Sequence, residues 1–130
     1  TIGVSPQAGS PLACAAGAST MRAINAGVVE HTKEAGGVLH DALSGLIDQF
    51  PEYVVATHGV GLYRTLEFQS DGLAGEFVTT VRKQGLLVAP PAGSTLTLNP
   101  TLICSEQEIK RGVDMMGAAL LEWYERDNNF

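Results

Sequence analysis

The chain has 130 residues, which is enough for one domain with a hydrophobic core of its own. Eight Lys and Arg against fourteen Asp and Glu give a net charge of −6, and no basic run exceeds two residues, which argues against a nucleic-acid-binding surface. No uninterrupted apolar stretch reaches the ~18–20 residues of a membrane span. We therefore expect neither a nucleic acid nor a membrane as partner.

The two cysteines, Cys14 and Cys104, lie far apart and belong to no CxxC or Cys/His spacing. This pattern is typical of reduced thiols in a cytoplasmic protein, and we expect both side chains to be small buried apolar residues. The first residue is Thr1 instead of Met, and no charged leader with an apolar core follows it. We expect a cytoplasmic chain that is a piece of a longer protein.

The residues up to Gly9 mix Gly, Ser and Pro, which is typical of a loop. Ser10 followed by Pro11 predicts a helix start, because a serine hydroxyl caps a helix and proline at the first position lacks only an N–H that would be unpaired there. This helix is expected to reach about Ile24. Its residues 13–19 are all small, so another backbone can approach closely, either from the protein's own sheet or from another domain or subunit.

A second helix is predicted from Val28 to Phe50, where apolar residues recur with helical spacing, and Pro51 ends it. His31 and His40 lie on this helix. We expect both on its solvated face and too far apart to share a metal ion.

Two antiparallel strands are predicted next. Residues Tyr53 to Thr57 are mostly apolar and rich in β-branched side chains, His58 to Gly61 is expected to turn, and apolar and polar residues alternate from Leu62 to Phe68. The turn lacks the third glycine and the following helix of a dinucleotide-binding loop, so a tight hairpin explains it better than a phosphate cradle. His58 is then the one histidine at a position where functional residues concentrate.

Ser70 or Asp71 is expected to cap a third helix, which closes at Gly85. A strand is predicted over Leu86 to Ala89, and a short returning strand around Leu96 and Leu98. Prolines separate the two strands and follow the second one.

The last helix begins at the segment SEQE, in which Ser105 and Glu108 have the spacing of a capping box. The order of the elements predicts an α+β fold, in which two N-terminal helices are followed by a small, mainly antiparallel sheet covered by helices on one face. We find no internal repeat.

The sequence contains no pattern of residues typical of covalent or metal-dependent catalysis. The chain has no GxSxG segment and no cysteine in a catalytic context. Its lysines, Lys33, Lys83 and Lys110, fall on polar helix faces, whereas a lysine that forms a Schiff base needs a desolvated pocket. We therefore predict no catalytic residue and no metal site in this chain.

Five segments together resemble the C-terminal portion of class III pyridoxal-phosphate aminotransferases, the group of ornithine and omega-amino-acid aminotransferases. They follow one another with family-like spacing over nearly the whole chain: GSPLACAA at 9–16, HGVGLYRTLEF at 58–68, GLLVAPP at 85–91, LTLNPTL at 96–102 and SEQEI at 105–109.

The resemblance implies the C-terminal domain of a fold-type I enzyme that depends on pyridoxal phosphate and transfers an amino group between an amine or amino acid and a keto acid or aldehyde. Residues 1–27 would be a loop and linker helix, and residues 28–130 the C-terminal α+β domain. The resemblance places the reactive lysine upstream, in a large domain that is the expected partner, and implies a homodimer. The chain alone would be incomplete and inactive.

Departures from the family pattern concern the expected cofactor and substrate contacts. Ser10 stands at the Asn of a Gly-Asn-Pro-Leu helix start, and Pro6 at a threonine that binds the cofactor phosphate in the family. Proline has no donor, so Ser5 or Gln7 would have to substitute, and Ser5, Gln7 and Ser10 are the predicted cofactor-binding residues.

On the substrate side, Thr97 stands where many members have an arginine that pairs with a substrate carboxylate. The family's Arg-Gly is replaced by His58-Gly59, whereas Glu67 keeps the acidic position of the following strand. Arg64, on the otherwise apolar face of that strand, is either a cation reaching for the sheet edge or a substitute carboxylate binder. We take Thr97 and Arg64 as the predicted substrate-binding residues.

Two other hypotheses remain open. The chain could be a degenerate, non-catalytic aminotransferase-like domain that serves as a binding or oligomerisation module through the small-residue helix. It could also be a free-standing ligand-binding domain that shares only the fold.

Overall fold

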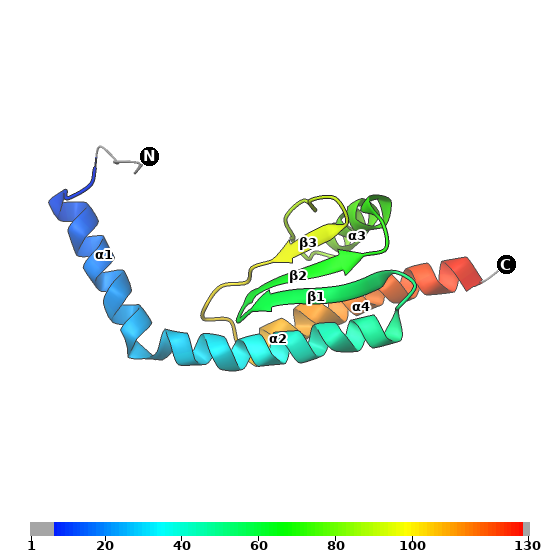
Figure 1. Ribbon diagram of the computed structural model, residues 1–130, viewed down its shortest axis with the longest axis horizontal. Helices are drawn as coiled ribbons and strands as arrows, with labels where there is room; N and C mark the ends of the chain where they lie inside the picture. The colour runs from blue at the N-terminus through cyan, green and yellow to red at the C-terminus, as the bar shows by residue number, and fades with distance from the viewer. Residues whose placement is uncertain (1–6, 129–130) are drawn as a thin grey trace.

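The computed structural model describes residues 7–128. A three-stranded antiparallel sheet packs against helices α2 and α3, helix α4 packs against both of these helices, and helix α1 projects from one end of this body (Figure 1). The predicted α+β class, with two N-terminal helices and a helix-covered antiparallel sheet, is confirmed.

Helix α1 (Pro11–Ala23) begins at the predicted residue, and Oγ of Ser10 accepts a hydrogen bond of 3.3 Å from the backbone N–H of Ala13. A short π-helical turn, η1 (Ile24–Val28), separates it from α2 (Val29–Gln49). In this turn Ala26 leaves helical geometry and Gly27 adopts φ 111°, a conformation that favours glycine. The chain therefore bends between the two helices.

Helix α2 buries one stripe of its surface, formed by Ala35, Gly36, Leu39, Leu43 and Leu46. A Cβ atom placed on Gly36 would lie 2.5 Å from the backbone of Gly61. The helix and the hairpin between the first two strands therefore touch backbone to backbone, which only glycine allows.

The sheet consists of β1 (Val54–Val60), β2 (Tyr63–Phe68) and β3 (Thr95–Leu98), in that order. The predicted hairpin is confirmed, but the predicted turn at His58 to Gly61 is wrong in its position. His58 and Gly59 pair with Thr65 and Arg64 as part of β1, so the chain reverses only after Val60. Gly59 adopts φ 119°, and a Cβ atom at this position would collide with the carbonyl oxygen of Tyr63, so this part of the strand requires glycine.

The strand predicted over Leu86 to Ala89 does not form. The backbone N–H of Leu86 donates to the carbonyl of Val81, and the guanidinium of Arg82 donates to the carbonyl of Val88. Because α3 takes up these groups, the segment runs beside the sheet without pairing to it.

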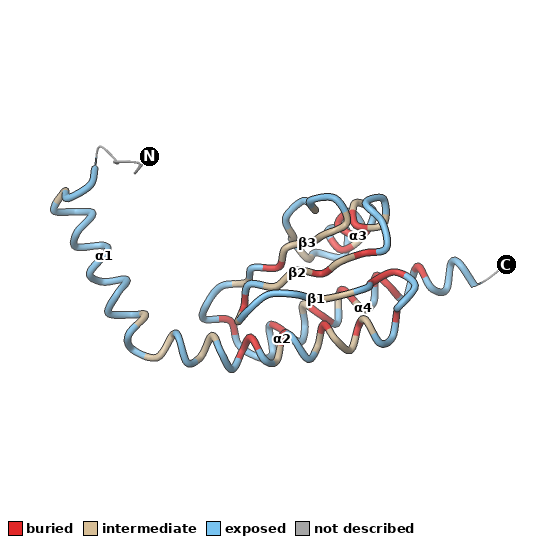
Figure 2. The backbone as a smooth tube through the Cα atoms, in the orientation of Figure 1, coloured by how far each residue is buried: buried red, intermediate tan, exposed pale blue. Residues whose placement is uncertain are grey.

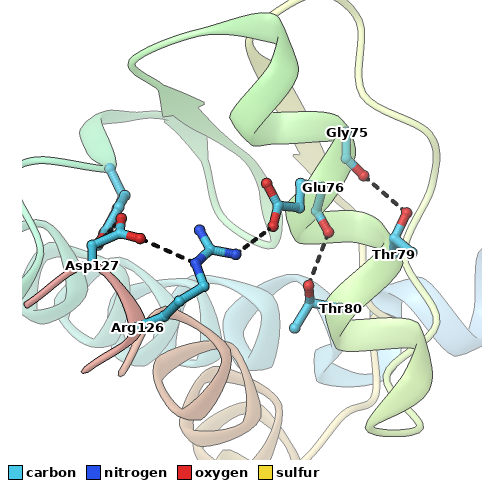
Figure 3. Close-up of polar contacts among 7 residues, drawn as sticks. Gly75, Glu76, Thr79, Thr80, Arg126 and Asp127 are labelled. Atoms are coloured by element: carbon cyan, nitrogen blue, oxygen red, sulfur yellow. Dashed lines mark hydrogen bonds and ion pairs between the residues drawn. The ribbon is translucent and has the colours of Figure 1, made fainter. Parts of the chain in front are cut away.

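Helices α3 (Asp71–Lys83) and α4 (Glu106–Asn128) complete the core. Aromatic rings join the layers, since the Phe77 ring lies 4.8 Å from that of Phe68 and 6.0 Å from that of Trp123. At the surface, Arg126 of α4 binds Glu76 of α3 and its own neighbour Asp127 (Figure 3).

Helix α1 is exposed along its whole length (Figure 2). Cys14 is therefore exposed, which corrects the expectation that both cysteines are buried, while Cys104 is buried as predicted. The helical run Pro11–Gln49 contains an 18-residue window of mean hydropathy 1.2 with no buried residue. By length and composition alone, this run is long and apolar enough to cross a membrane. Core helices of other proteins and leader sequences have the same length and composition, so this property is only weak evidence for a membrane span.

Candidate functional site

Two of the predicted cofactor-binding residues, Gln7 and Ser10, lie at the start of α1. Ser5 lies outside the described residues, as does Pro6. Gln7 is exposed, and its carbonyl accepts a hydrogen bond of 3.1 Å from the backbone N–H of Ser10. The Ser10 hydroxyl accepts from Ala13 and keeps its own proton to donate.

Pyridoxal phosphate needs an enclosed site with a phosphate cradle, and the start of α1 has only part of what such a site requires. The helix has no acidic residue in its first turn, which suits an anion at its N-terminus. However, residues 11–23 are all exposed, so nothing in the described part of the chain encloses a cofactor there. These residues do not form a cofactor site alone.

The predicted substrate residue Thr97 lies on the sheet face that carries no helix. It pairs with Thr65 of β2, which in turn pairs with His58 of β1. Antiparallel partners place their side chains on the same face, so the three form one row across the sheet. Thr97 and Thr65 are half-buried, and His58 is exposed.

Glu67 lies beside this row on the same face, where it pairs with Ala56 and Thr95. Oε2 of Glu67 lies 3.6 Å from Nε2 of His58, and the two side chains are 43% and 68% exposed. Water screens an ion pair at that exposure, so it adds little to stability. The row and the adjacent Glu67 therefore offer two hydroxyl groups, one imidazole and one carboxylate to a ligand.

The second predicted substrate residue, Arg64, lies on the opposite face from Thr97, because it pairs with Leu98. Its guanidinium donates from Nε to the carbonyl of Gly61 at 3.2 Å and from Nη1 to the carbonyl of Gly59 at 2.9 Å. Arg64 thus closes the hairpin that begins β2, and the structure does not bring it together with Thr97.

A cavity of about 420 Å³ lies between the segment 86–89, the end of β3 and the first turns of α4. Its lining is mostly apolar and includes Leu39, Leu86, Ile109, Val113 and Met116, with Thr97 and Asn99 at the sheet end. Cys104 and Glu108 also line it.

These two titratable groups do not supply a nucleophile. Burial raises the pKa of the Cys104 thiol, which disfavours the thiolate. The hydrogen bonds from the backbone N–H and hydroxyl of Ser105 lower the pKa of Glu108, and both are accepted by its Oε2. All three lysines are exposed, and the described residues contain no group of three potential metal ligands.

One histidine has a role that the sequence did not indicate. His31 was expected on a solvated face, but it is half-buried, and its Nε2 lies 2.9 Å from the carbonyl oxygen of Cys104. Because Cys104 is 73 residues away in the sequence, the spacing of residues along the helix could not predict this contact. His40 is exposed, as expected.

Comparison with known proteins identifies the family. The model of the family "Aminotransferase class-III" matches residues 6–120. Acetylornithine aminotransferase from Synechocystis is 30% identical over 115 residues, covering 86% of this chain and 27% of that protein. The acetylornithine aminotransferase of Methanosarcina acetivorans is 33% identical over 112 residues, covering 85% of this chain and 27% of that protein.

Solved structures share the fold. Acetylornithine aminotransferase from Elizabethkingia anophelis superposes with a TM-score of 0.80 at 22% identity, covering 86% of this chain and 29% of that chain. Lysine aminotransferase from Mycobacterium tuberculosis gives 0.75 at 24% identity, covering 79% of this chain and 24% of that chain. This chain spans only about a quarter of the length of its relatives. Since the family model covers most of its residues, the chain belongs to the class III aminotransferases.

Proposed function

We propose that this chain is the C-terminal part of a pyridoxal-phosphate-dependent aminotransferase that moves an amino group between an amine or amino acid and a keto acid or aldehyde. The observation that carries the proposal is the family match over residues 6–120. It favours this function over a degenerate binding module. With no lysine in a desolvated pocket among the described residues, the chain alone is expected to be inactive.

In the parent enzyme the cofactor supplies the electron sink for the chemistry. The contribution we propose for this chain is to hold the cofactor's phosphate, through Ser5, Gln7 and Ser10. The exposed, acid-free start of α1 supports this, because the positive end of a helix dipole attracts an anion. The rest of the site must come from elsewhere in the enzyme.

On the substrate side we propose that Thr97 contacts the substrate, with Thr65 and His58 beside it in the row. Thr97 is uncharged and cannot form the bidentate pair that an arginine makes with a carboxylate. Among the described residues at the paired positions of this face, His58 is the one side chain that can become positively charged. The preferred amino donor therefore lacks a carboxylate at this position, or reaches a cation supplied from outside the chain.

Arg64 remains the alternative carboxylate binder. To act so, its guanidinium would have to leave the carbonyls of Gly59 and Gly61 and reach around the sheet. Its present bonds and its opposite face make it the weaker candidate.

The division into a linker of residues 1–27 and a domain of residues 28–130 is part of the proposal, and the bend at Gly27 supports it. The proposed partners are the large cofactor-binding domain and a second subunit, with no nucleic acid and no membrane. The cytoplasm is the proposed location, although two relatives are named as mitochondrial, an ornithine aminotransferase of Arabidopsis thaliana and an acetylornithine aminotransferase of Yarrowia lipolytica.

The test uses the full-length protein that contains this chain. It is saturated with pyridoxal phosphate, and amino transfer to a keto acid is measured from N-acetylornithine, ornithine, lysine and an amine without a carboxylate. We expect turnover with at least one donor, highest for the amine, and none from the 130-residue chain alone. A full-length protein that neither retains the cofactor nor uses any donor would restore the binding-module hypothesis.

A further inference from the structure

The cavity between the segment 86–89, the end of β3 and α4 is large enough to hold a small molecule. Its volume is about 420 Å³, and pockets that bind such molecules measure roughly 300–1,000 Å³. Its floor is formed by side chains of α2 and α4, which pack side by side (Figure 1). Among them Leu39, Val113 and Met116 are at most 7% exposed. Cavities lined by apolar side chains stay dry and bind small apolar molecules.

The walls of this cavity are held in place by hydrogen bonds. On one side the segment 86–89 is bound to α3, because Nη2 of Arg82 donates to the carbonyl of Val88 at 2.9 Å. On the other side Nε2 of His31 lies 2.9 Å from the carbonyl oxygen of Cys104, which fixes the loop before α4 to α2. The cavity is therefore preformed, and a ligand would not have to order its walls.

Glu108 is the one charged residue among the described residues that line the cavity. Its Oε2 accepts two hydrogen bonds from Ser105, whereas no described residue donates to its Oε1. Three basic residues on the surrounding elements, His31, Arg64 and Arg82, contact backbone carbonyls and do not belong to the lining. An apolar cavity with a carboxylate at its rim and no basic side chain in its lining favours a cation over an anion.

The cavity lies on the helix-covered face of the sheet. Leu98 lines it and is buried. Because side chains alternate along a strand, the side chain of Thr97 points to the opposite face, where it forms the row with Thr65 and His58. The cavity and this row are therefore on different faces of the sheet.

We propose that the cavity binds a small molecule that has an apolar body and a positively charged amino group. The body would lie between α4 and the segment 86–89, and the amino group at Oε1 of Glu108. Leu87 lines the cavity although it is 85% exposed, so the bound molecule would also cover an apolar side chain that now faces water. Binding here does not depend on amino transfer, so the site would exist even if the proposed function failed.

The test uses the full-length parent protein, saturated with pyridoxal phosphate, and two probes that share one apolar body. N,N-Dimethyl-4-phenylbutylamine is positively charged and, as a tertiary amine, cannot give up its nitrogen in amino transfer. 4-Phenylbutanoate is negatively charged. Calorimetry measures the binding of each probe. Alkylation of Cys104 by N-ethylmaleimide, quantified by mass spectrometry of its peptide, reports whether the cavity is filled, because this thiol belongs to the lining.

Three variants locate the probe. Gly112→Leu fills the cavity from α4, since Gly112 belongs to the lining and a Cβ atom there would lie 4.0 Å from Cδ1 of Leu86. Gly37→Leu is the matched control on the exposed side of α2, outside the lining, where a Cβ atom meets nothing within 4 Å. Glu108→Gln removes the charge and keeps a side chain that capping boxes accept.

We expect one amine molecule to bind per chain, roughly fivefold more tightly than the carboxylate. It should slow the alkylation of Cys104 and leave that of Cys14, which lies outside the cavity, unchanged. Glu108→Gln should remove the difference between the two probes. Gly112→Leu should abolish binding, and Gly37→Leu should have no effect.

Several results would overturn the proposal. Equal affinity of the wild type for both probes would refute the role of Glu108, and binding that survives Gly112→Leu would place the amine elsewhere, such as where amino donors bind. A parent that binds neither probe would show that the cavity takes no such ligand or is filled by the rest of the polypeptide. Protection of Cys104 requires no variant, so an amine that binds without slowing its alkylation would refute the site even if Gly112→Leu did not fold.

Discussion

The hydroxyl group of Tyr53 donates a hydrogen bond of 2.8 Å to Oδ2 of Asp127, across 74 residues of sequence. Tyr53 is buried just before β1, and Asp127 lies in the last turn of α4. The same carboxylate accepts a bond from Arg126, which also reaches Glu76 of α3 (Figure 3). One contact thus fixes the end of α4 to the beginning of the sheet.

Replacing Tyr53 by Phe should lower the free energy of unfolding by about 1 kcal/mol, because it removes one hydrogen bond and keeps the ring against Trp123. Chemical unfolding of the two proteins measures the difference. Arg126→Gln is the matched control at the surface, where we expect a smaller loss that salt reduces further. A larger loss for Arg126→Gln would contradict this ranking.

The same pair predicts a pH dependence. Burial, and then the bond to Asp127, raise the pKa of Tyr53 from 10.0 to about 12. A phenol whose pKa is higher in the folded state binds its proton more tightly there, so its stabilising effect is complete below pH 10 and is lost as the pH rises through about 12. Unfolding midpoints measured from pH 9 upward should fall more steeply for the wild type than for Tyr53→Phe.

Gly36→Ala should destabilise the domain strongly, because the new Cβ would lie 2.5 Å from the backbone of Gly61. Backbone must shift to admit it, and overpacking of this kind costs roughly 1–3 kcal/mol or more. Gly37→Ala is the control on the next residue of α2, where a Cβ meets nothing within 4 Å. There alanine should stabilise the helix by up to about 1 kcal/mol, so thermal melts of the two variants should move in opposite directions.

Ser105→Ala should cost about 1 kcal/mol at neutral pH, since it removes the cap of α4. The bonds from Ser105 lower the pKa of Glu108 in the folded state below its unfolded-state value of 4.5. The resulting stabilisation of the folded state is present above pH 4.5 and is lost as the pH falls through the folded-state pKa. The cost of Ser105→Ala should therefore shrink from pH 6 to pH 3.

Ser70→Ala is the comparison for this pH dependence. Ser70 caps α3 by accepting from Leu73, an apolar residue that carries no carboxylate. Its loss should cost a similar amount at both pH values. If the two variants followed the same pH profile, the coupling between Ser105 and Glu108 would be refuted.

Arg64→Met should lower the stability of the isolated chain by about 1 kcal/mol, because two bonds to hairpin carbonyls are lost from a half-exposed side chain. In the parent enzyme it should leave KM for the amino donor unchanged. Arg64→Lys keeps the charge without the two directed donors, and should be destabilised nearly as much. A rise in KM for carboxylate donors in both variants would instead favour Arg64 as a substrate residue.

Local signals predicted much of the fold. Two helix starts were predicted from residues close together in sequence, Ser10 with Pro11 and Ser105 with Glu108. Both starts are confirmed. The hairpin was predictable because alternation and glycines lie in one short segment. Its turn position was not, because it is set by the pairing of His58 and Gly59 with β2, which the sequence pattern does not reveal.

Features that depend on distant partners were missed. The segment 86–89 has the composition of a strand, but Val81 and Arg82 take its hydrogen bonds. His31 and Tyr53 find partners more than 70 residues away. For the candidate site, the sequence placed Arg64 and Thr97 on two strands, but only the observed pairing of Arg64 with Leu98 shows that these strands are neighbours and that the two side chains lie on opposite faces of one sheet.

The substitution that tests the substrate face most directly is Thr97→Arg in the parent enzyme. It restores a guanidinium in the row with Thr65 and His58, where a bidentate pair with a substrate carboxylate becomes possible. We expect KM for amino-acid donors to fall roughly tenfold, the equivalent of about 1.4 kcal/mol, and that for a carboxylate-free amine to stay or rise. The control is Thr95→Arg, on the same face and strand but paired with Glu67, which should bind the new charge and leave both donors unchanged. If both arginines lowered KM equally, general charge attraction would explain the effect and Thr97 would lose its assigned place at the substrate.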